Sequence, residues 1–433
     1  MKTDWDVIII GAGAAGLSLG ALLVQVPDRR GLILEASDEV GGKARVWRDQ
    51  GFYFDNGVHA LILGEASSGA AILSEIGRPI KVHGAGMCLY RDKRFLPLFS
   101  KNLASFFQQK ALGWKDLRKF AHLAMDMPGI RKGKFYSVSV GEWLEQVQAG
   151  PGLRDFFRIL SMGLLATDHL ERASLGELIL FGRLVARARH ILGYPEGGWT
   201  GIFESLVEKV RSLPRARLEF GEKVQKILVE KGKVRGVIAG GREVTASQVV
   251  SSLPVQEIYQ QGLLEPDQFP SLQARVENFR PTFGLVFDLG LDKLISKDDR
   301  IIASPDYPAL FWFYSNLSPE LAPPGKQILT VFTPLEKADL DSPTRLQDRE
   351  KGIWEILDEM FPGIRKLAVI EKIRAIPING LELNTAAGLP DRPRVDEYSN
   401  QGLYLIGDTV GVPGVGGELA FRSARECFRI LSS

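Results

Sequence analysis

Uninterrupted apolar runs that stop at a glycine or an acid are the strongest pattern in the chain. One run, residues 7–10, ends at Gly11, and a second ends at Glu35. A third, residues 403–406, ends at Gly407 and is followed by further glycines and a run with helical spacing. Short runs without polar interruption predict strands buried on both faces of a parallel sheet. The pattern therefore predicts an α/β fold.

Three glycines after the first run indicate a nucleotide site. Gly11 allows a tight turn out of the strand, Gly13 lets the backbone approach a pyrophosphate, and Gly16 lets the next helix pack closely on the sheet. The N-terminus of that helix offers free N–H groups and the positive end of a dipole to phosphates. Glu35, at the end of the second strand, is placed to accept hydrogen bonds from an adenosine ribose.

The residues after Glu35 favour a flavin over a nicotinamide. Gly41, Gly42 and Lys43 are not part of the simple nicotinamide pattern. Together with Glu35 they resemble the ExxxxxGG(R/K) signature of FAD-dependent flavoproteins of the amine oxidase and phytoene desaturase superfamily, which includes carotenoid and retinoid oxidoreductases. Lys43 stands in place of the more usual Arg and lacks its bidentate fork. The resemblance implies a Rossmann-type FAD-binding domain of the GR2 type with an inserted α+β substrate domain.

Further segments extend this resemblance. Residues 53–59 resemble the "TGLH" flavin-contact segment of plant-type desaturases, and residues 194–198 resemble the "YPxGG" turn that returns the chain to the cofactor domain. The resemblance implies that Asp408 binds the ribityl chain and that the helix after Gly417 faces the pyrimidine end of the flavin. The FAD contacts that it implies are Gly11, Gly13, Ala14, Ala15, Gly16, Glu35, Ala36, Gly42, Lys43, Gly57, Val58, Val224, Asp408, Gly417, Glu418 and Leu419.

Length and pattern predict two domains, because 433 residues exceed one ordinary core. The segments that we assign to the FAD-binding domain are 1–75, 195–258 and 390–433, and those of the substrate-binding domain are 76–194 and 259–389. Alternation predicts a hairpin over 224–238, in which Val224 is the implied adenine contact. The first insertion is mostly helical by pattern, whereas the second contains strand-like runs at 282–289 and 327–332.

Charge and cysteine content exclude several protein classes. A net charge of +2 gives no bias towards nucleic acid. Cys88 and Cys427 are too few for a disulfide framework and favour a reducing compartment. The first strand begins almost at the N-terminus, which leaves no room for a signal peptide, and no run of 18 apolar residues occurs. We expect a cytoplasmic protein that binds no nucleic acid.

Residues 93–134 form a local anomaly in composition. Basic residues alternate there with large apolar ones such as Phe106, Phe107 and Trp114. This mixture suits a helix that lies in a membrane interface, and desaturases of the family that the chain resembles draw lipophilic substrates from membranes. A core helix with a solvated basic face gives the same pattern. Peripheral membrane contact and ordinary packing therefore both stay open.

The sequence gives little indication of residues for acid–base, nucleophilic or metal-assisted catalysis. The five histidines have no Cys, Asp or Glu partner at metal-ligand spacing, so no metal site is predicted, and no nucleophile motif is visible. A flavin enzyme needs neither, because the isoalloxazine carries the hydride chemistry. The resemblance places His59 near the isoalloxazine. His59 is therefore either the candidate catalytic residue or a structural histidine bonded to a backbone carbonyl.

Three functions compete. The first is an FAD-dependent desaturase, saturase or isomerase that transfers hydride between flavin N5 and a lipophilic polyene or isoprenoid. The second is an amine oxidase or protoporphyrinogen oxidase type of enzyme. Amine oxidases of this superfamily frame the flavin with aromatic residues just before and after the last cofactor strand. Residues 372–401 contain Tyr398 as their single aromatic residue, which argues against this alternative. The third, a non-catalytic lipid-binding flavoprotein, ranks last because the cofactor motifs are intact.

Overall fold

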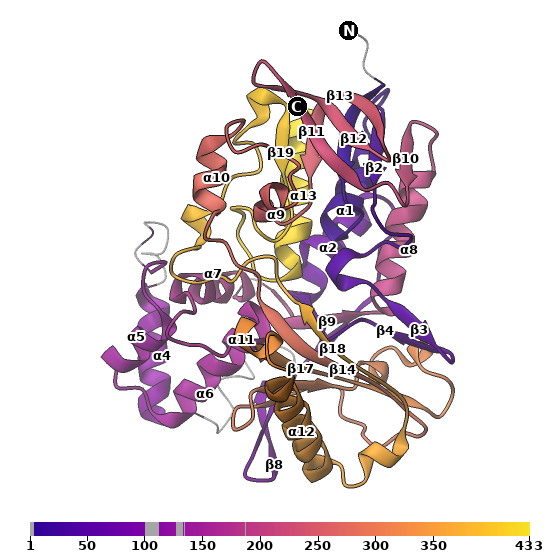
Figure 1. The fold of residues 1–433 in the computed structure, drawn as a ribbon. Helices are drawn as coiled ribbons and strands as arrows, with labels where there is room; N and C mark the ends of the chain where they lie inside the picture. Colours follow the sequence, from indigo (N-terminus) through magenta and orange to yellow (C-terminus); the bar gives the residue numbers. More distant parts are fainter. Residues whose placement is uncertain (1–3, 100–111, 127–132, 134, 187) are drawn as a thin grey trace.

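The computed structural model describes residues 4–99, 112–126, 133, 135–186 and 188–433. Two lobes lie one above the other in Figure 1, and each contains one large β-sheet. The upper lobe combines segments from the beginning, the middle and the end of the chain, whereas the lower lobe uses the segments between them. The α/β fold class that the apolar runs predicted is confirmed.

The sheet of the upper lobe, here called the Rossmann lobe, has a parallel core. Its parallel strands in spatial order are β10 (Ala216–Glu219), β2 (Gly31–Leu34), β1 (Trp5–Ile10), β13 (Arg242–Ser251) and β19 (Leu403–Leu405). The predicted hairpin, β11 (Val224–Glu230) and β12 (Lys233–Ala239), continues the sheet along β13. Helix α1 (Ala14–Leu23) packs on β1 and β2 and contacts both α8 (Gly198–Arg211) and α13 (Gly417–Ser432). This packing buries the apolar runs.

The sheet of the lower lobe, here called the second lobe, is mostly antiparallel. Its strands in spatial order are β18 (Ala368–Pro377), β14 (Phe283–Leu291), β17 (Gln327–Leu335), β16 (Ala309–Trp312), β15 (Ile301–Ser304), β7 (Met87–Arg91) and β8 (Arg94–Phe99). The pair β15 and β7 is parallel, and the other neighbours are antiparallel. Strands β14 and β17 confirm the two strand-like runs predicted for the second insertion.

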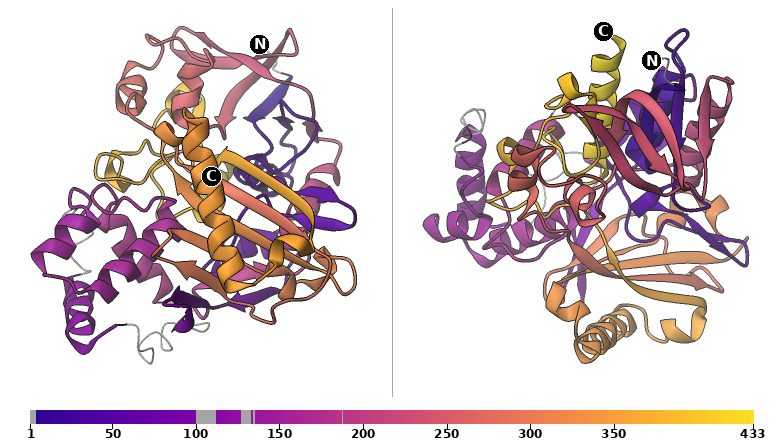
Figure 2. Two further views of the ribbon diagram at one scale, coloured as in Figure 1. Left: turned by 60° about the horizontal axis from the view of Figure 1, so that its bottom comes forward. Right: turned by 45° about the horizontal axis from the view of Figure 1, so that its top comes forward.

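The two faces of this sheet have different partners. Leu285, Phe287 and Leu289 of β14 share one apolar cluster with α12 (Pro343–Met360), which crosses the outer face of the sheet (Figures 1 and 2). Val286 belongs instead to the main core, because successive side chains along a strand point to opposite faces. The sheet therefore turns a second apolar face towards the interior of the molecule.

A group of helices lies beside the second lobe (Figures 1 and 2). It consists of α4 (Trp114–Asp126), α5 (Val140–Gln146), α6 (Pro151–Leu160), a π-helical turn (Ser161–Leu165) and α7 (Leu175–Val185). The start of the first insertion is not helical, since β6 (Val82–Ala85), β7 and β8 are strands. Strand β6 pairs with β9 (Leu192–Pro195), and β7 pairs with β15. Strands β7 and β8 pair with each other, but the pairings of β6 and of β7 with these distant strands leave no local pattern in the sequence.

Short elements complete the fold. They are β3 (Trp47–Asp49), β4 (Phe52–Phe54), β5 (Leu61–Ile62), α2 (Ser68–Glu75), α9 (Val255–Gln260), α10 (Pro270–Val276) and α11 (Lys337–Leu340). The described 3₁₀ turns are Gly42–Ala44, Gly64–Ala66, Tyr314–Asn316, Pro319–Leu321, Ile364–Leu367, Leu389–Asp391 and Ser399–Gln401. Strands β3 and β4 form a hairpin, and β5 pairs with β9.

Residues 93–134 do not form one interfacial helix. Strand β8 pairs with β7, and its Leu98 is buried in the core, because apolar side chains alternate across a strand. Trp114, at the start of α4, is 82% exposed. Phe106 and Phe107 lie outside the described residues. Within the described part of the chain, none of the helices reaches the length and apolarity that a bilayer crossing requires.

A buried ion pair joins the helical group to the segment before β19. Nη2 of Arg392 lies 2.7 Å from Oε1 of Glu177 in α7, and both side chains are 0% exposed. The same carboxylate oxygen accepts the Leu389 N–H at 2.8 Å. Loss of either partner would leave a buried charge without compensation, which strongly destabilises a fold. The pair therefore fixes α7 against the C-terminal part of the chain.

Candidate functional site

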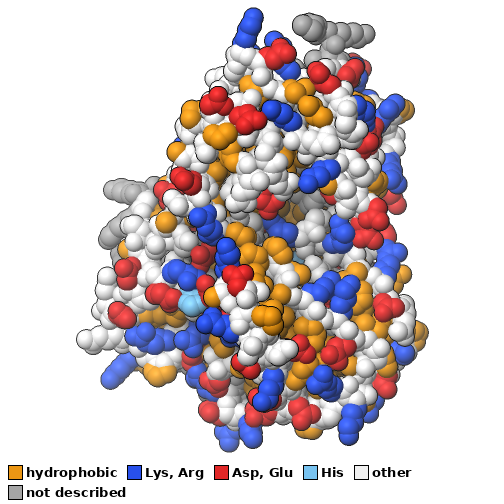
Figure 3. Space-filling model, viewed as in Figure 1, with side chains coloured by type: hydrophobic (Ala, Val, Ile, Leu, Met, Phe, Trp, Pro, Cys, Tyr) orange, Lys and Arg blue, Asp and Glu red, His pale blue; other side chains and the backbone are white. Residues whose placement is uncertain are grey.

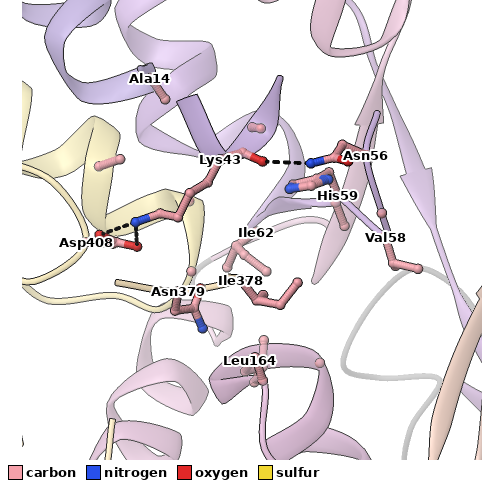
Figure 4. A pocket seen from close by; sticks show the side chains of 18 of the residues that line it. Ala14, Lys43, Asn56, Val58, His59, Ile62, Leu164, Ile378, Asn379 and Asp408 are labelled. Atoms are coloured by element: carbon pink, nitrogen blue, oxygen red, sulfur yellow. Dashed lines mark hydrogen bonds and ion pairs between the residues drawn. The ribbon is translucent and has the colours of Figure 1, made fainter. Parts of the chain in front are cut away.

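A cavity of about 360 Å³ is lined by residues of both lobes. At one end it meets the glycine-rich turn after β1. The predicted cofactor residues that line it are Gly11, Gly13, Ala14, Ala15, Glu35, Gly42, Lys43, Gly57, Val58, Asp408 and Gly417, together with the candidate catalytic residue His59. The structure thus gathers at one cavity segments that lie far apart in the sequence (Figure 4).

The glycine-rich turn is shaped as an open cradle. A Cβ added at Gly16 would lie 2.0 Å from the carbonyl oxygen of Gly11, so close helix–strand packing requires glycine there. A Cβ at Gly13 would meet its nearest protein atom, Cα of Gly42, only at 3.9 Å. A side chain at Gly13 would therefore fill the cradle rather than strike the protein. The cradle sits at the N-terminus of α1, whose first N–H groups have no partner within the helix.

Glu35 is held by the turn that it faces. One carboxylate oxygen accepts the Ala12 N–H at 2.7 Å, and the other accepts the N–H and the hydroxyl of Ser37 at 3.0 and 2.8 Å. These bonds occupy three of the roughly four acceptor positions of a carboxylate. Glu35 also lines the cavity. The acceptor position that remains is therefore available to a ribose hydroxyl.

Lys43 reaches across the cavity to Asp408. Its ammonium nitrogen lies 2.8 and 3.0 Å from the two carboxylate oxygens (Figure 4). Asp408 also accepts the Gly380 N–H at 2.7 Å. On the other side, Asn56 donates its amide N–H to the Lys43 carbonyl at 3.4 Å. Lys43 therefore acts here as a point charge beside the predicted ribityl acid.

Five predicted cofactor residues do not line the cavity. Gly16 is enclosed by helix–strand packing, Ala36 is exposed, and Leu419 is buried. Val224 is 5% exposed in β11, close to the bond in which Glu222 donates its N–H to the Glu35 carbonyl. The Glu418 side chain turns away to α2, where it accepts the N–H and hydroxyl of Ser68 at 2.9 and 2.6 Å. Only its backbone is left for a cofactor, and these five contacts stay predictions.

His59 lies in the cavity wall, braced by Trp199. The indole N–H of Trp199 donates to the His59 carbonyl at 3.0 Å, and the two rings meet edge to face at 5.7 Å. Burial lowers the pKa of His59 to about 4, although the backbone of Gly57 and Asp55 partly opposes this. The imidazole is therefore neutral near pH 7. With a pKa this far below 7, the imidazole binds a proton weakly and is a poor general base at that pH.

A buried acid supports the turn that carries His59. Asp55 is 1% exposed and accepts a hydrogen bond from the Tyr194 hydroxyl, while its N–H donates to the Tyr314 hydroxyl at 3.3 Å. Burial raises the pKa of Asp55 to about 7. Asp55 and Tyr194 belong to two motifs that lie far apart in the sequence. Their contact was not predicted, because only the fold brings Tyr194 in β9 next to the residue that follows β4.

The rest of the cavity is an aliphatic chamber that extends away from Ala14 (Figure 4). Its apolar lining consists of Ile62, Met87, Ile159, Leu160, Met162, Leu164, Phe181, Ile191, Leu192, Val286, Ile301, Leu310, Phe332 and Ile378. Within the described residues, the acids that line the cavity are Glu35 and Asp408, both at the cofactor end. Asn379 lines the chamber with an amide for which no hydrogen-bond partner occurs in the described chain. Sequence reasoning missed Asn379.

Two further features of the chain bear on chemistry. Among the residues with a described placement, no group of three or more His, Cys, Asp or Glu side chains is arranged to hold a metal ion. Tyr398, the aromatic residue between 372 and 401, packs edge to face on Phe269 at 5.3 Å and does not line the cavity. It cannot frame a flavin from that position.

Comparison with known proteins identifies the family. A model of the flavin-containing amine oxidoreductases matches residues 14–427. The chain belongs to this family. Membership of the flavin-containing amine oxidoreductases confirms the flavin that the glycine motifs predicted, and FAD is its cofactor. The open cradle at Gly13 and the paired acids Glu35 and Asp408 fit an adenine dinucleotide with a ribityl chain.

Individual relatives agree with the fold. A lycopene-forming phytoene desaturase from Pseudescherichia vulneris is 24% identical, with 94% of this chain and 96% of the desaturase aligned. The solved structure of an oxidoreductase from Methanosarcina mazei matches with a TM-score of 0.81 and 22% identity, covering 98% and 100% of the two chains. A putrescine oxidase structure matches with a TM-score of 0.69 and 15% identity over 99% of each chain. At these identities the solved structures show the fold alone.

Proposed function

We propose that the protein is a phytoene desaturase-like oxidoreductase that transfers hydride between FAD and an uncharged, lipophilic polyene or isoprenoid. The aliphatic chamber beside the cofactor cradle carries this proposal. Bound FAD supplies the hydride chemistry at N5. The protein's own task is then to hold a C–H bond of the substrate beside the flavin and to exclude water.

The chamber favours a substrate without charge. Moving an ammonium or carboxylate from water into an apolar site costs several kcal/mol unless an opposite charge meets it. The two acids at the cavity already have partners, since Asp408 pairs with Lys43 and Glu35 accepts three hydrogen bonds. An apolar chain has no charge to desolvate in such a site and gains free energy by leaving water.

Two relatives support the same substrate class. The Pseudescherichia vulneris relative is a phytoene desaturase, and it aligns along nearly its whole length. An all-trans-retinol 13,14-reductase from Danio rerio is 38% identical over 65 residues, which is 15% of this chain and 10% of the reductase. Both names describe chemistry on an isoprenoid chain. The second match is local and supports the shared segment alone.

An amine substrate is the alternative that the putrescine oxidase fold suggests. Tyr398 lies outside the cavity, and the chamber offers no unpaired carboxylate among its described residues. Both observations speak against an amine. A third alternative, a lipid-binding flavoprotein without catalysis, predicts the same chamber and is separated from an enzyme only by turnover.

The proposal includes peripheral contact with a membrane through α4. Trp114 is 82% exposed, and Lys115 and Arg118 are exposed beside it. An aromatic side chain flanked by cations suits the interface of an anionic membrane. Over the face of the molecule drawn in Figure 3, charges of both signs are interspersed.

The test uses the FAD-loaded protein without oxygen. Oxidised and chemically reduced samples are mixed with an acyclic polyene or with an alkylamine, and the flavin absorbance is followed. We expect the polyene to change the redox state of the flavin in one of the two samples and the amine to leave it unchanged. Oxidation of the amine with bleaching of the flavin would overturn the proposal. Binding of a polyene without redox change would establish the non-catalytic alternative.

A further inference from the structure

The chamber wall contains a π-helical turn, Ser161–Leu165, directly after α6. The carbonyl of Ser161 closes this turn by accepting the N–H of Ala166 and, at 3.3 Å, that of Thr167. Ala166 has a φ of 56°, a left-handed conformation that is strained for a residue with a Cβ. π turns are rare and occur frequently at functional sites. A strained residue at such a turn persists because the surrounding structure enforces it.

The turn presents consecutive residues to the chamber. Met162, Gly163 and Leu164 of the turn all line it, as does Ala166 directly after the turn, whereas on a regular α-helix neighbouring residues point about 100° apart. Gly163 is exposed although Met162 and Leu164 on either side are buried. Its backbone therefore borders open space.

The missing side chain at Gly163 leaves that space free. A Cβ there would meet its nearest atom, Cδ1 of Leu310, at 3.7 Å, which is ordinary van der Waals contact. Its φ is not in the left-handed region, so the backbone does not require glycine. A larger side chain at 163 would extend into the chamber rather than into the protein. Glycine at this position thus adds to the size of the chamber without serving the fold.

We propose that Gly163 sets the size limit of the substrate chamber, and that the π turn admits a long, extended hydrocarbon chain alongside its backbone. This inference rests on the proposed function and names the substrate more narrowly. Gly163 and Leu310 lie side by side in one wall of the chamber. A larger side chain at position 163 can therefore be offset by a smaller one at position 310. Met87 and Met162 in the same lining are flexible and can adapt to a chain with several double bonds.

The experiment measures binding of a short, a medium and a long acyclic polyene by the shift that each causes in the absorbance of bound FAD. We expect Gly163→Leu to weaken binding of the long polyene by about tenfold to a hundredfold, because the added methylenes would overpack the chamber once the long chain occupies it. Binding of the short polyene and the FAD content should stay within about threefold of wild type. Gly163→Ala should give the same order with smaller changes.

Two further variants make the result specific. In Gly163→Leu/Leu310→Ala the new side chain can occupy the space that Leu310 leaves, so binding of the long polyene should recover. Gly113→Leu is the matched control, because a Cβ at the exposed Gly113 meets no atom within 4 Å and lies outside the chamber. It should bind all three polyenes as wild type does.

The outcomes separate the inference from the proposed function. If wild type binds the polyenes and Gly163→Leu binds each length equally well, the inference is wrong and the proposed function stands. If wild type binds no polyene of any length, the proposed function fails and the inference fails with it. Should Gly163→Leu lose FAD, the length-dependent order must appear in Gly163→Ala, and its absence there overturns the inference.

Discussion

Lys43 and Asp408, which follow β2 and β19, form an ion pair with a distance of 2.8 Å between Nζ and Oδ2. The Asp408 side chain is 12% exposed and the Lys43 side chain 35%. Asp408 also accepts the N–H of Gly380. The pair therefore joins three segments that are distant in sequence at the cofactor end of the cavity.

This pair predicts unequal effects on FAD binding. Asp408→Ala removes charge-assisted hydrogen bonds and leaves Lys43 unpaired, so we expect FAD affinity to fall by about tenfold to a hundredfold. Lys43→Met should cost less, because Asp408 keeps the Gly380 N–H. Titration of the apoprotein with FAD measures both. Asp348→Ala on the exposed face of α12 is the control, and an Asp408→Ala variant with the same FAD affinity as this control would contradict the assignment.

His59→Ala tests whether this histidine transfers a proton. A positioned acid or base contributes about 10²–10⁴-fold to a rate. Because burial lowers the pKa of His59 to about 4, we expect turnover of a polyene to fall by less than about 10²-fold, with FAD retained. A larger loss at unchanged FAD content would make His59 a proton-transfer residue and reject the structural role.

Asp55 gives stability a pH dependence of definite sign. Burial raises its pKa to about 7 in the folded protein, against about 3.9 in an unfolded chain. Between these values the folded state holds the proton and the unfolded state does not. The Asp55 contribution therefore falls as pH rises from about 4 to 7, by on the order of 4 kcal/mol.

The variant Asp55→Asn isolates this contribution. His59 opposes it in wild type, because its lowered pKa removes stability as pH falls from about 6.5 to 4. The unfolding free energy of Asp55→Asn relative to wild type should therefore rise between pH 4 and 7. Urea unfolding of the holoprotein at several pH values measures this difference. A difference that does not change with pH would mean that Asp55 is ionised when folded.

The buried pair Glu177–Arg392 predicts strong non-additivity. Either Glu177→Ala or Arg392→Ala leaves a charge without a partner at a site that is 0% exposed, and should lower the free energy of unfolding by about 3–5 kcal/mol. The double variant Glu177→Leu/Arg392→Met should cost much less than the sum. Lys351→Ala, which breaks the exposed pair with Glu355, is the control and should change stability by less than about 1 kcal/mol. Additive losses in urea unfolding would contradict this.

Membrane contact through α4 is tested with anionic vesicles at low salt. Trp114→Ser should reduce co-sedimentation while FAD stays bound, and added salt should weaken the attraction because it screens surface cations. Leu294→Ser is the matched control, since Leu294 is 63% exposed on a different segment. Equal binding by the two variants would remove α4 from the contact surface.

The sequence alone determined the Rossmann unit and its cofactor. Strands, turns and helix starts follow from short-range patterns. Gly11 has a positive φ and Gly16 packs against the Gly11 carbonyl, so backbone geometry local to the turn requires both, whereas Gly13 leaves the cradle open. For this reason the parallel sheet, the hairpin at β11 and β12 and FAD were all predictable. The placement of β6 beside β9 and of β7 beside β15 was not, because these partners lie far apart in the chain.

Only the tertiary structure decided how the site is held and what it can accept. The contacts of Trp199 with His59, of Tyr194 with Asp55 and of Lys43 with Asp408 join separate motifs. The pKa values of His59 and Asp55 depend on burial, which no local pattern records. The chamber likewise combines side chains from both lobes. The space beside Gly163 is bounded by Leu310, which is distant in sequence. Packing depends on contacts between segments that are distant in the chain, whereas a sequence pattern records only relations between near neighbours.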